Sequence, residues 1–168
     1  EVGAGLPIDA YWETVRASAL AGSQITNAMN GFFEEVLFRG FLLIQAYVII
    51  EGRRKVRRPA WAGLIVPLLI SQAYFAAGHI PNRLYLGFPP AQIMREQAGL
   101  IAIGALCALI YLRSGNIFMA MGTHILLNSP LSLFLPQAAA SVLIGVTALI
   151  VVLPWRPAWR RFSPAWAR

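Results

Sequence analysis

Charged residues are scarce in this sequence of 168 residues, in which 12% of the residues are charged and 58% are hydrophobic. A soluble domain this apolar would lack the polar surface needed to cover itself, whereas a helical bundle exposed to lipid does not need that surface. Cysteine is nearly absent as well. The single cysteine, Cys107, lies inside an apolar run, so no internal disulfide can form. The composition therefore predicts an integral membrane protein.

The sequence also lacks β-type alternation, internal repeats, low-complexity linkers and a basic-then-apolar signal peptide. Its apolar residues instead fall into blocks that suit transmembrane helices, which predicts an all-α, polytopic membrane bundle with about five spans. We expect one domain, residues 1–168, and interpret the start at Glu1 as a fragment or processed form that could lack earlier helices. The expected spans are residues 31–50, 60–78, 97–112, 116–128 and 137–153, with an interfacial helix at 10–30 and a loop rich in helix breakers between the second and third spans.

Basic residues outnumber acidic residues by 14 to 7, which gives a net charge of +7. They cluster at the ends of the apolar blocks, above all in Arg53–Arg58 and in the C-terminal tail, as juxtamembrane charge does. This placement predicts contact with membrane lipids and argues against a nucleic-acid partner. If the Arg53–Arg58 loop is cytoplasmic, Arg113 and the tail fall on the same side, so a cytoplasmic C-terminus is predicted.

Ionisable residues inside a span cost about 2.5–3.5 kcal/mol each on insertion scales, so each one needs an explanation. The first span contains Glu34, Glu35 and Arg39. Glu35 and Arg39 are one helical turn apart and can neutralise each other. Glu34 lies about 100° away around the helix and has no such partner. A spare carboxylate in a low-dielectric site suits a general base, although both glutamates could instead serve helix packing or face a water cavity.

The chain has two histidines, and each lies one helical turn from another notable side chain. Phe75 and His79 share a face at the end of the second span, and the small residues between them permit close helix approach. His79 could also be a capping or interfacial residue. His124 and Asn128 share a face of the fourth span, where both could donate hydrogen bonds to a developing oxyanion or could join helices together.

Four of these residues are expected at one depth in the membrane. Alternating spans bring the start of the first span to the same side as the ends of the second and fourth spans. We therefore expect Glu34, His79, His124 and Asn128 to meet around a cavity between these three spans that opens laterally to lipid.

The three motifs together match a known pattern. Glu34-Glu35-x-x-x-Arg39, Phe75-x-x-x-His79 and His124-x-x-x-Asn128 resemble the motifs of the type II CaaX prenyl endopeptidases and of their bacterial relatives, the CPBP or Abi proteins. The resemblance covers about residues 31–128, in the family's order and on separate helices. Each motif is short and weak alone, whereas the three together are specific.

The resemblance implies an all-helical, metal-free intramembrane peptidase of a bacterial or archaeal plasma membrane. Such an enzyme would cleave a peptide bond near the C-terminus or membrane anchor of a membrane-associated or lipidated protein. It implies that Glu34 activates water with the help of His79, and that His124 and Asn128 stabilise the tetrahedral oxyanion. The supporting residues it implies are Glu35, Arg39 and Phe75. The predicted topology departs from family members that act on cytosolic C-termini, because here the site is predicted near the opposite face.

Three other functions also fit parts of the pattern. Glu34, His79 and His124 could bind zinc as a His₂Glu site, although the H-E-x-x-H zinc signature is absent from the sequence. The chain could be a non-catalytic scaffold or immunity protein that keeps the motifs as a structural core. A transporter would also explain buried carboxylates, but the fourth span has no polar stripe along its length.

Overall fold

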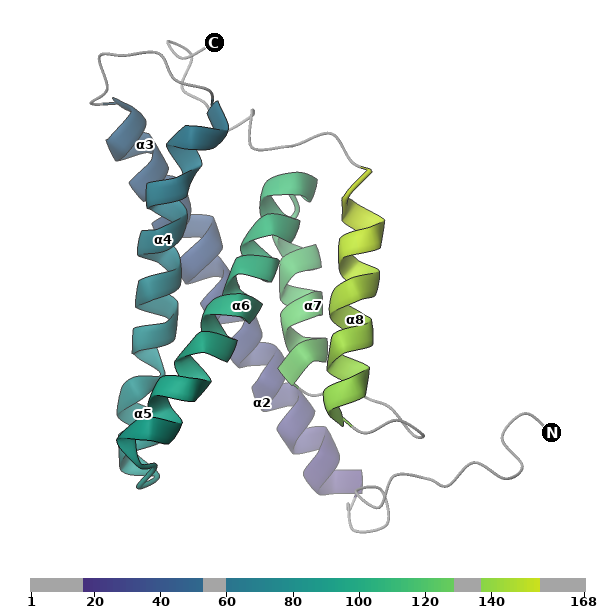
Figure 1. The fold of residues 1–168 in the computed structure, drawn as a ribbon. Helices are drawn as coiled ribbons and strands as arrows, with labels where there is room; N and C mark the ends of the chain where they lie inside the picture. The colour runs from purple at the N-terminus through teal and green to yellow at the C-terminus, as the bar shows by residue number, and fades with distance from the viewer. Residues whose placement is uncertain (1–16, 53–59, 129–136, 155–168) are drawn as a thin grey trace, which may run out of the picture.

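The computed structural model describes residues 17–52, 60–128 and 137–154, in which all regular secondary structure is helical. The elements are α2 (Ala17–Glu35), the π-helix η1 (Val36–Leu43), α3 (Ile44–Gly52), α4 (Ala60–Gly78), α5 (Ile80–Tyr85), α6 (Pro90–Ser114), α7 (Ile117–Asn128) and α8 (Gln137–Val152) (Figure 1). The prediction of an all-α bundle is confirmed for these ranges. Residues 10–16, the basic run Arg53–Arg58 and the C-terminal tail lie outside them, so the predictions made for these segments are not tested.

The first part of the bundle is one long helix, because α2, η1 and α3 follow one another without a break. Figure 1 shows this helix crossing the molecule from the lower end of α2 to the upper end of α3. The break expected at residue 31, between an interfacial helix and the first span, is not present in the structure. Glu34 therefore lies near the middle of a long helix rather than one turn from its beginning.

The π-helix η1 begins directly after Glu35. Such segments are rare and frequently occur at functional sites, because their wider turns change which side chains share a face. A side chain from α4 stabilises this one, since the hydroxyl of Ser71 donates a hydrogen bond of 2.7 Å to the carbonyl oxygen of Phe38. Arg39 and Leu43 are the buried side chains of η1.

The segment after α4 differs from the predicted loop. The breakers after residue 78 were expected to end the helix, but after a turn at His79 the chain forms α5. Proline is tolerated in the first turn of a helix, where its missing N–H has no intrahelical partner, and Pro81 occupies that place. The direction of the chain changes instead around Gly87, whose φ of 75° suits glycine. α6 then begins at Pro90, earlier than the predicted start at residue 97.

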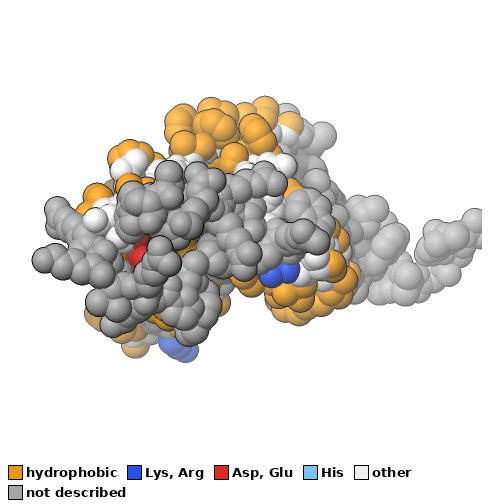
Figure 2. Space-filling view, turned by 90° about the horizontal axis from the view of Figure 1, so that it is seen from above, with side chains coloured by type: hydrophobic (Ala, Val, Ile, Leu, Met, Phe, Trp, Pro, Cys, Tyr) orange, Lys and Arg blue, Asp and Glu red, His pale blue; other side chains and the backbone are white. Residues whose placement is uncertain are grey.

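The bounds of α4, α7 and α8 agree with the predicted second, fourth and fifth spans to within one residue. Two helical stretches, Ala62–Tyr85 and Pro90–Ser114, are long and apolar enough to cross a membrane, whereas α7 and the apolar part of α8 are shorter. Fewer than half of the residues in the most apolar part of each stretch are buried within the described structure. In Figure 2 hydrophobic side chains cover most of the described surface in view. The count of five spans stays a prediction.

Candidate active site

Glu35 and its partners form a fully buried cluster at the centre of the bundle. The Glu35 side chain and that of Arg39 are both 0% exposed, and Arg39 Nη1 lies 3.0 Å from Glu35 Oε1. Arg39 also donates from Nη2 to the carbonyl oxygen of Gly104 in α6, at 3.0 Å. The predicted pairing of Glu35 with Arg39 is thus present, and the hydrogen bond from Arg39 to Gly104 links η1 to α6.

His124 joins the same cluster from α7. Its Nδ1 lies 2.8 Å from Glu35 Oε1, so Nδ1–H donates a hydrogen bond to the carboxylate. The contact fixes the orientation of the imidazole and directs Nε2 towards Glu34, whose Oε2 is 3.6 Å away. This hydrogen bond between Glu35 and His124 was not predicted, because it joins residues on different helices.

The ring of Phe75 packs against both histidines. It meets His79 edge-to-face at a centroid distance of 5.0 Å and His124 at 5.8 Å. The guanidinium of Arg39 lies over the same ring, 4.4 Å from its centroid, in a cation–π contact. Phe75 therefore packs against both histidines and against the guanidinium of the buried charge pair, and so helps to hold these three side chains in place.

Glu34 has a different environment from its neighbour. Its side chain is 28% exposed, and its Oε1 lies 4.0 Å from Nε2 of His79. The other carboxylate oxygen, Oε2, is buried and has no hydrogen-bond partner among the described residues. Neither contact with a histidine is short enough for a strong direct hydrogen bond. Glu34 thus presents a carboxylate that is close to two imidazoles and hydrogen-bonded to neither.

The tautomer of His79 follows from a backbone contact. Its Nδ1 lies 2.9 Å from the carbonyl oxygen of Phe75, which can only accept, so Nδ1 carries the hydrogen. In the neutral ring Nε2 then holds a lone pair, and this atom faces Glu34. The unshared electrons of the imidazole and of the carboxylate are therefore directed into the same space.

A cavity of about 370 Å³ adjoins these groups, within the size range of small-ligand sites. It lies between the first long helix and the α4–α5 and α7 segments, as predicted, and the described residues that line it are Asn27, Asn30, Glu34, Phe38, Phe75, Gly78, His79, Asn82 and Asn128. Glu34, His79 and Asn128 thus share one cavity. His124 is not among its lining residues, but its Nε2 lies 3.6 Å from Oε2 of Glu34.

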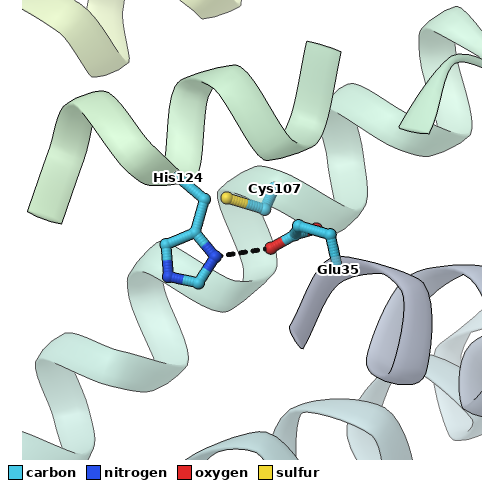
Figure 3. Close-up of side chains that lie close together, drawn as sticks. All are labelled: Glu35, Cys107 and His124. Carbon is cyan, nitrogen blue, oxygen red and sulfur yellow. Dashed lines mark hydrogen bonds and ion pairs between the residues drawn. The ribbon is translucent and has the colours of Figure 1, made fainter. Parts of the chain in front are cut away.

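Cys107 of α6 completes the buried cluster, as Figure 3 shows beside Glu35 and His124. Ligand-type atoms of these three side chains lie within 4.8 Å of one another, and all three are buried. A metal ion there would need the lone pair of Nδ1 on His124, but that nitrogen donates to Glu35. It would also face Arg39, which lies 3.0 Å from the same carboxylate oxygen. The contacts of Glu35 with Arg39 and His124 therefore form a hydrogen-bonded ion pair that does not require a metal ion. The zinc site predicted at Glu34, His79 and His124 stays a prediction.

Sequence reasoning missed several residues that line or support the cavity. Asn27 and Asn30 lie on the same helical face as Glu34, at spacings of seven and four residues, which is a visible stripe. The helix boundary expected at residue 31 concealed it. Cys107, Gly104 and Ser71 carry no comparable signal, because their roles depend on contacts between helices.

The fold and the site define a class of protein: a helical bundle with apolar helices of membrane-spanning length and a carboxylate–histidine site enclosed between them. The chain belongs to the type II CAAX prenyl endopeptidase Rce1-like family, whose model matches residues 16–130. That match includes all three motifs, so the resemblance to this family is confirmed, and proteins of this family are embedded in membranes. No curated protein and no solved structure matches the chain.

Proposed function

We propose that the protein is an intramembrane endopeptidase in which Glu34 activates water. The bond it hydrolyses lies near the C-terminus or membrane anchor of a membrane-associated or lipidated substrate. The observation that carries this proposal is the position of Glu34, with a carboxylate 4.0 Å from His79 and 3.6 Å from His124 at the wall of the cavity. Membership of a family of CAAX-type endopeptidases supports the reaction class.

In this mechanism a water molecule bridges Glu34 and His79. The 4.0 Å between Oε1 and Nε2 is too long for a direct hydrogen bond and suits two acceptors that share one water. Because both hydrogens of that water are held, a lone pair on its oxygen is directed at the substrate carbonyl carbon. As the new C–O bond forms, Glu34 takes the proton and negative charge develops on the former carbonyl oxygen.

Asn128 and His124 are the proposed donors to that oxyanion. Asn128 lines the cavity and donates from its carboxamide N–H groups without any change of protonation. His124 donates from Nε2 only when its ring holds two protons, because Nδ1–H is already bonded to Glu35. The intermediate collapses when the C–N bond breaks. The proton held by Glu34 then passes to the leaving amine, which restores the carboxylate.

Glu35, Arg39 and Phe75 act as positioning residues in this account. Glu35 holds the imidazole of His124 through Nδ1, Arg39 neutralises Glu35, and Phe75 packs between the two histidines. None of the three contacts the proposed water.

A cleavage assay tests the proposal. The purified protein in detergent is incubated with a panel of lipidated and unmodified C-terminal membrane peptides, with and without a chelator. Cleavage is expected, and Glu34→Gln should lower kcat by about 10²- to 10⁴-fold, the usual contribution of a general base. Glu96→Gln is the matched control, because it removes a carboxylate that does not line the cavity. It should change kcat less than about threefold, as expected of a partly exposed ion pair.

Other outcomes of the same assay favour other functions. Activity lost in chelator and restored by zinc would replace the metal-free mechanism with a zinc-dependent one. A folded protein that cleaves no peptide in the panel would contradict the proposal and favour a non-catalytic scaffold. Activity that survives Glu34→Gln would show that another group activates the water.

A further inference from the structure

Asparagines provide most of the polar lining of the cavity outside the family motifs. Asn27 and Asn30 come from α2 and Asn82 comes from α5, while Asn128 of the third motif completes the set. A carboxamide both donates and accepts hydrogen bonds, as a peptide group does, and it carries no charge. Such a lining is suited to polypeptide main chain, and it is poorly suited to an ionised ligand.

The orientation of one carboxamide is fixed by the fold. Nδ2 of Asn27 donates to the carbonyl oxygen of Ile125 in α7 at 2.9 Å. Its Oδ1 is therefore the atom that remains to accept an N–H from a bound chain. Asn27, Asn30 and Glu34 lie along one face of the helix, so a chain bound along this face at Glu34 would contact the two carboxamides.

The described lining holds no lysine or arginine, and its ionisable members are Glu34 and His79. Arg83 is next to Asn82 in sequence, but its Nε lies 2.7 Å from Oε2 of Glu96. That carboxylate also accepts a hydrogen bond of 3.0 Å from Gln92. The positive charge of Arg83 is thus neutralised where it joins α5 to α6. The segment that follows Asn128, residues 129–136, contains no basic residue either.

A substrate carboxylate inside this cavity would therefore meet the charge of Glu34 without a compensating cation among the described lining residues, which is unfavourable. We propose that the cavity binds a neutral, extended stretch of main chain through its asparagines. The enzyme would then cleave internal bonds of chains that continue beyond the cavity, without recognising a free C-terminal carboxylate. This inference rests on the proposed peptidase function and specifies its substrate class.

Paired peptides test the inference. Each lipidated, internally quenched peptide is made in three forms. The first ends in a free carboxylate and the second in a carboxamide, in each case three residues beyond the scissile bond. The third form has a longer C-terminal extension. The amide and the extended form should be cleaved with a kcat/KM equal to or above that of the acid. A site that binds a carboxylate through charged hydrogen bonds would instead lose about tenfold or more on amidation, and that result would overturn the inference.

Substitutions of the lining sharpen the test. Asn30→Leu and Asn82→Leu remove hydrogen-bonding groups while keeping a branched side chain with the same number of heavy atoms. Each should raise KM about five- to tenfold for all three forms of the peptide with little change in kcat, as expected for the loss of one hydrogen bond. An unchanged KM in both variants would contradict binding through the carboxamides. Asn128 is left intact because it belongs to the proposed oxyanion site.

A cation introduced into the lining should change the preference between the two termini. Asn82→Lys should improve the acid over the amide by about two- to fivefold, as expected for a partly exposed ion pair. Met94→Lys is the matched control, since Met94 is 70% exposed near the start of α6 and does not line the cavity. The control should leave the ratio unchanged. If Asn82→Lys also leaves the ratio unchanged, the lack of a cation in the lining does not explain the indifference to the terminal carboxylate, and the inference fails.

These outcomes separate this inference from the function on which it depends. If the wild-type protein cleaves no peptide form, the proposed peptidase function fails. If it cleaves the acid and discriminates against the amide, the function stands and only the assignment of the substrate class is overturned.

Discussion

Glu34 and Glu35 are adjacent in sequence and have opposite environments. Glu35 is 0% exposed and contacts Arg39 at 3.0 Å and His124 at 2.8 Å through the same oxygen. Glu34 is 28% exposed, and its nearest imidazole nitrogens are 3.6 and 4.0 Å away. One oxygen of Glu35 binds a guanidinium and an imidazole within the fold, whereas Glu34 makes no short contact with either imidazole and lines a cavity.

This difference separates structural from chemical roles within a single motif. A buried carboxylate that already binds a cation and an imidazole fixes the positions of these groups, and it is poorly placed to accept a further proton. A carboxylate at a cavity wall can accept a proton and return it within one catalytic cycle. The predictions below remove one side of this comparison at a time, in order of decreasing effect.

The largest effect on stability is expected for Glu35→Gln. This substitution leaves the guanidinium of Arg39 buried without its anion, which should lower the free energy of unfolding by about 3–5 kcal/mol. Denaturant titration in detergent measures the change. Cys107, the single cysteine and fully buried, reports unfolding through a thiol-reactive dye. The double variant Glu35→Gln/Arg39→Met removes both charges and should recover most of the loss. If the double variant is no more stable than Glu35→Gln, the unpaired charge is not the cause.

Gly104→Ala should be the next most destabilising change, because it perturbs the packing around the Glu35 cluster. A Cβ at this position would collide with Oε1 of Gln72 and lie 3.0 Å from both Arg39 Nη2 and Phe75 Cδ1. Overpacking of this kind costs about 1–3 kcal/mol. Gly99→Ala on the same helix is the control, since a Cβ there meets nothing within 4 Å. It should be neutral or stabilising by up to about 1 kcal/mol. Equal destabilisation in the two variants would contradict this account.

Ser71→Ala tests the support of the π-helix that follows the two glutamates. It removes the hydrogen bond of 2.7 Å to the carbonyl oxygen of Phe38, and the expected loss is about 1 kcal/mol with a measurable fall in kcat. Thr123→Val is the comparison, because the hydroxyl of Thr123 bonds to Met119 within its own helix. We expect Thr123→Val to change kcat less than Ser71→Ala does, and the reverse order would refute a role of η1 in aligning Glu34.

Arg83→Gln should have the smallest effect. The pair that Arg83 forms with Glu96 is partly exposed, at 27% and 29%, so its contribution to the free energy of unfolding should be below about 1 kcal/mol. Added salt should reduce the difference between Arg83→Gln and the wild-type protein. A loss of several kcal/mol that does not depend on salt would place Arg83 among the structural charges, with Arg39.

Local spacing was sufficient to predict the division between the two glutamates. Glu35 pairs with Arg39 one turn away, and the histidines of the other two motifs lie near Glu34. Both arrangements could be predicted, because the inferences use only helical geometry and the order of the helices. The bounds of three helices followed from apolar block length in the same way. The positions of Glu34, His79 and Asn128 around one cavity were thus predictable, and their catalytic roles stay proposals.

The features that were missed depend on contacts between helices or on a misjudged boundary. Nothing within residues 36–43 signals a π-helix, which is accompanied by long-range bonds from Ser71 to Phe38 and from Arg39 to Gly104. The hydrogen bond between Glu35 and His124 joins residues 89 positions apart. Pro81 was interpreted as a breaker, although the first turn of a helix accommodates proline.

The most direct test of the account compares Glu34→Gln with Glu35→Gln in two measurements on the same preparations, namely peptide cleavage and the free energy of unfolding in detergent. The account predicts that Glu34→Gln lowers kcat by about 10²- to 10⁴-fold. Its unfolding free energy should stay within about 1 kcal/mol of the wild-type value, because the carboxylate of Glu34 makes no short contact. Glu35→Gln should lose several times more stability. A Glu34→Gln variant that still cleaves the peptides, or that unfolds as readily as Glu35→Gln, would contradict the division of roles between the two carboxylates.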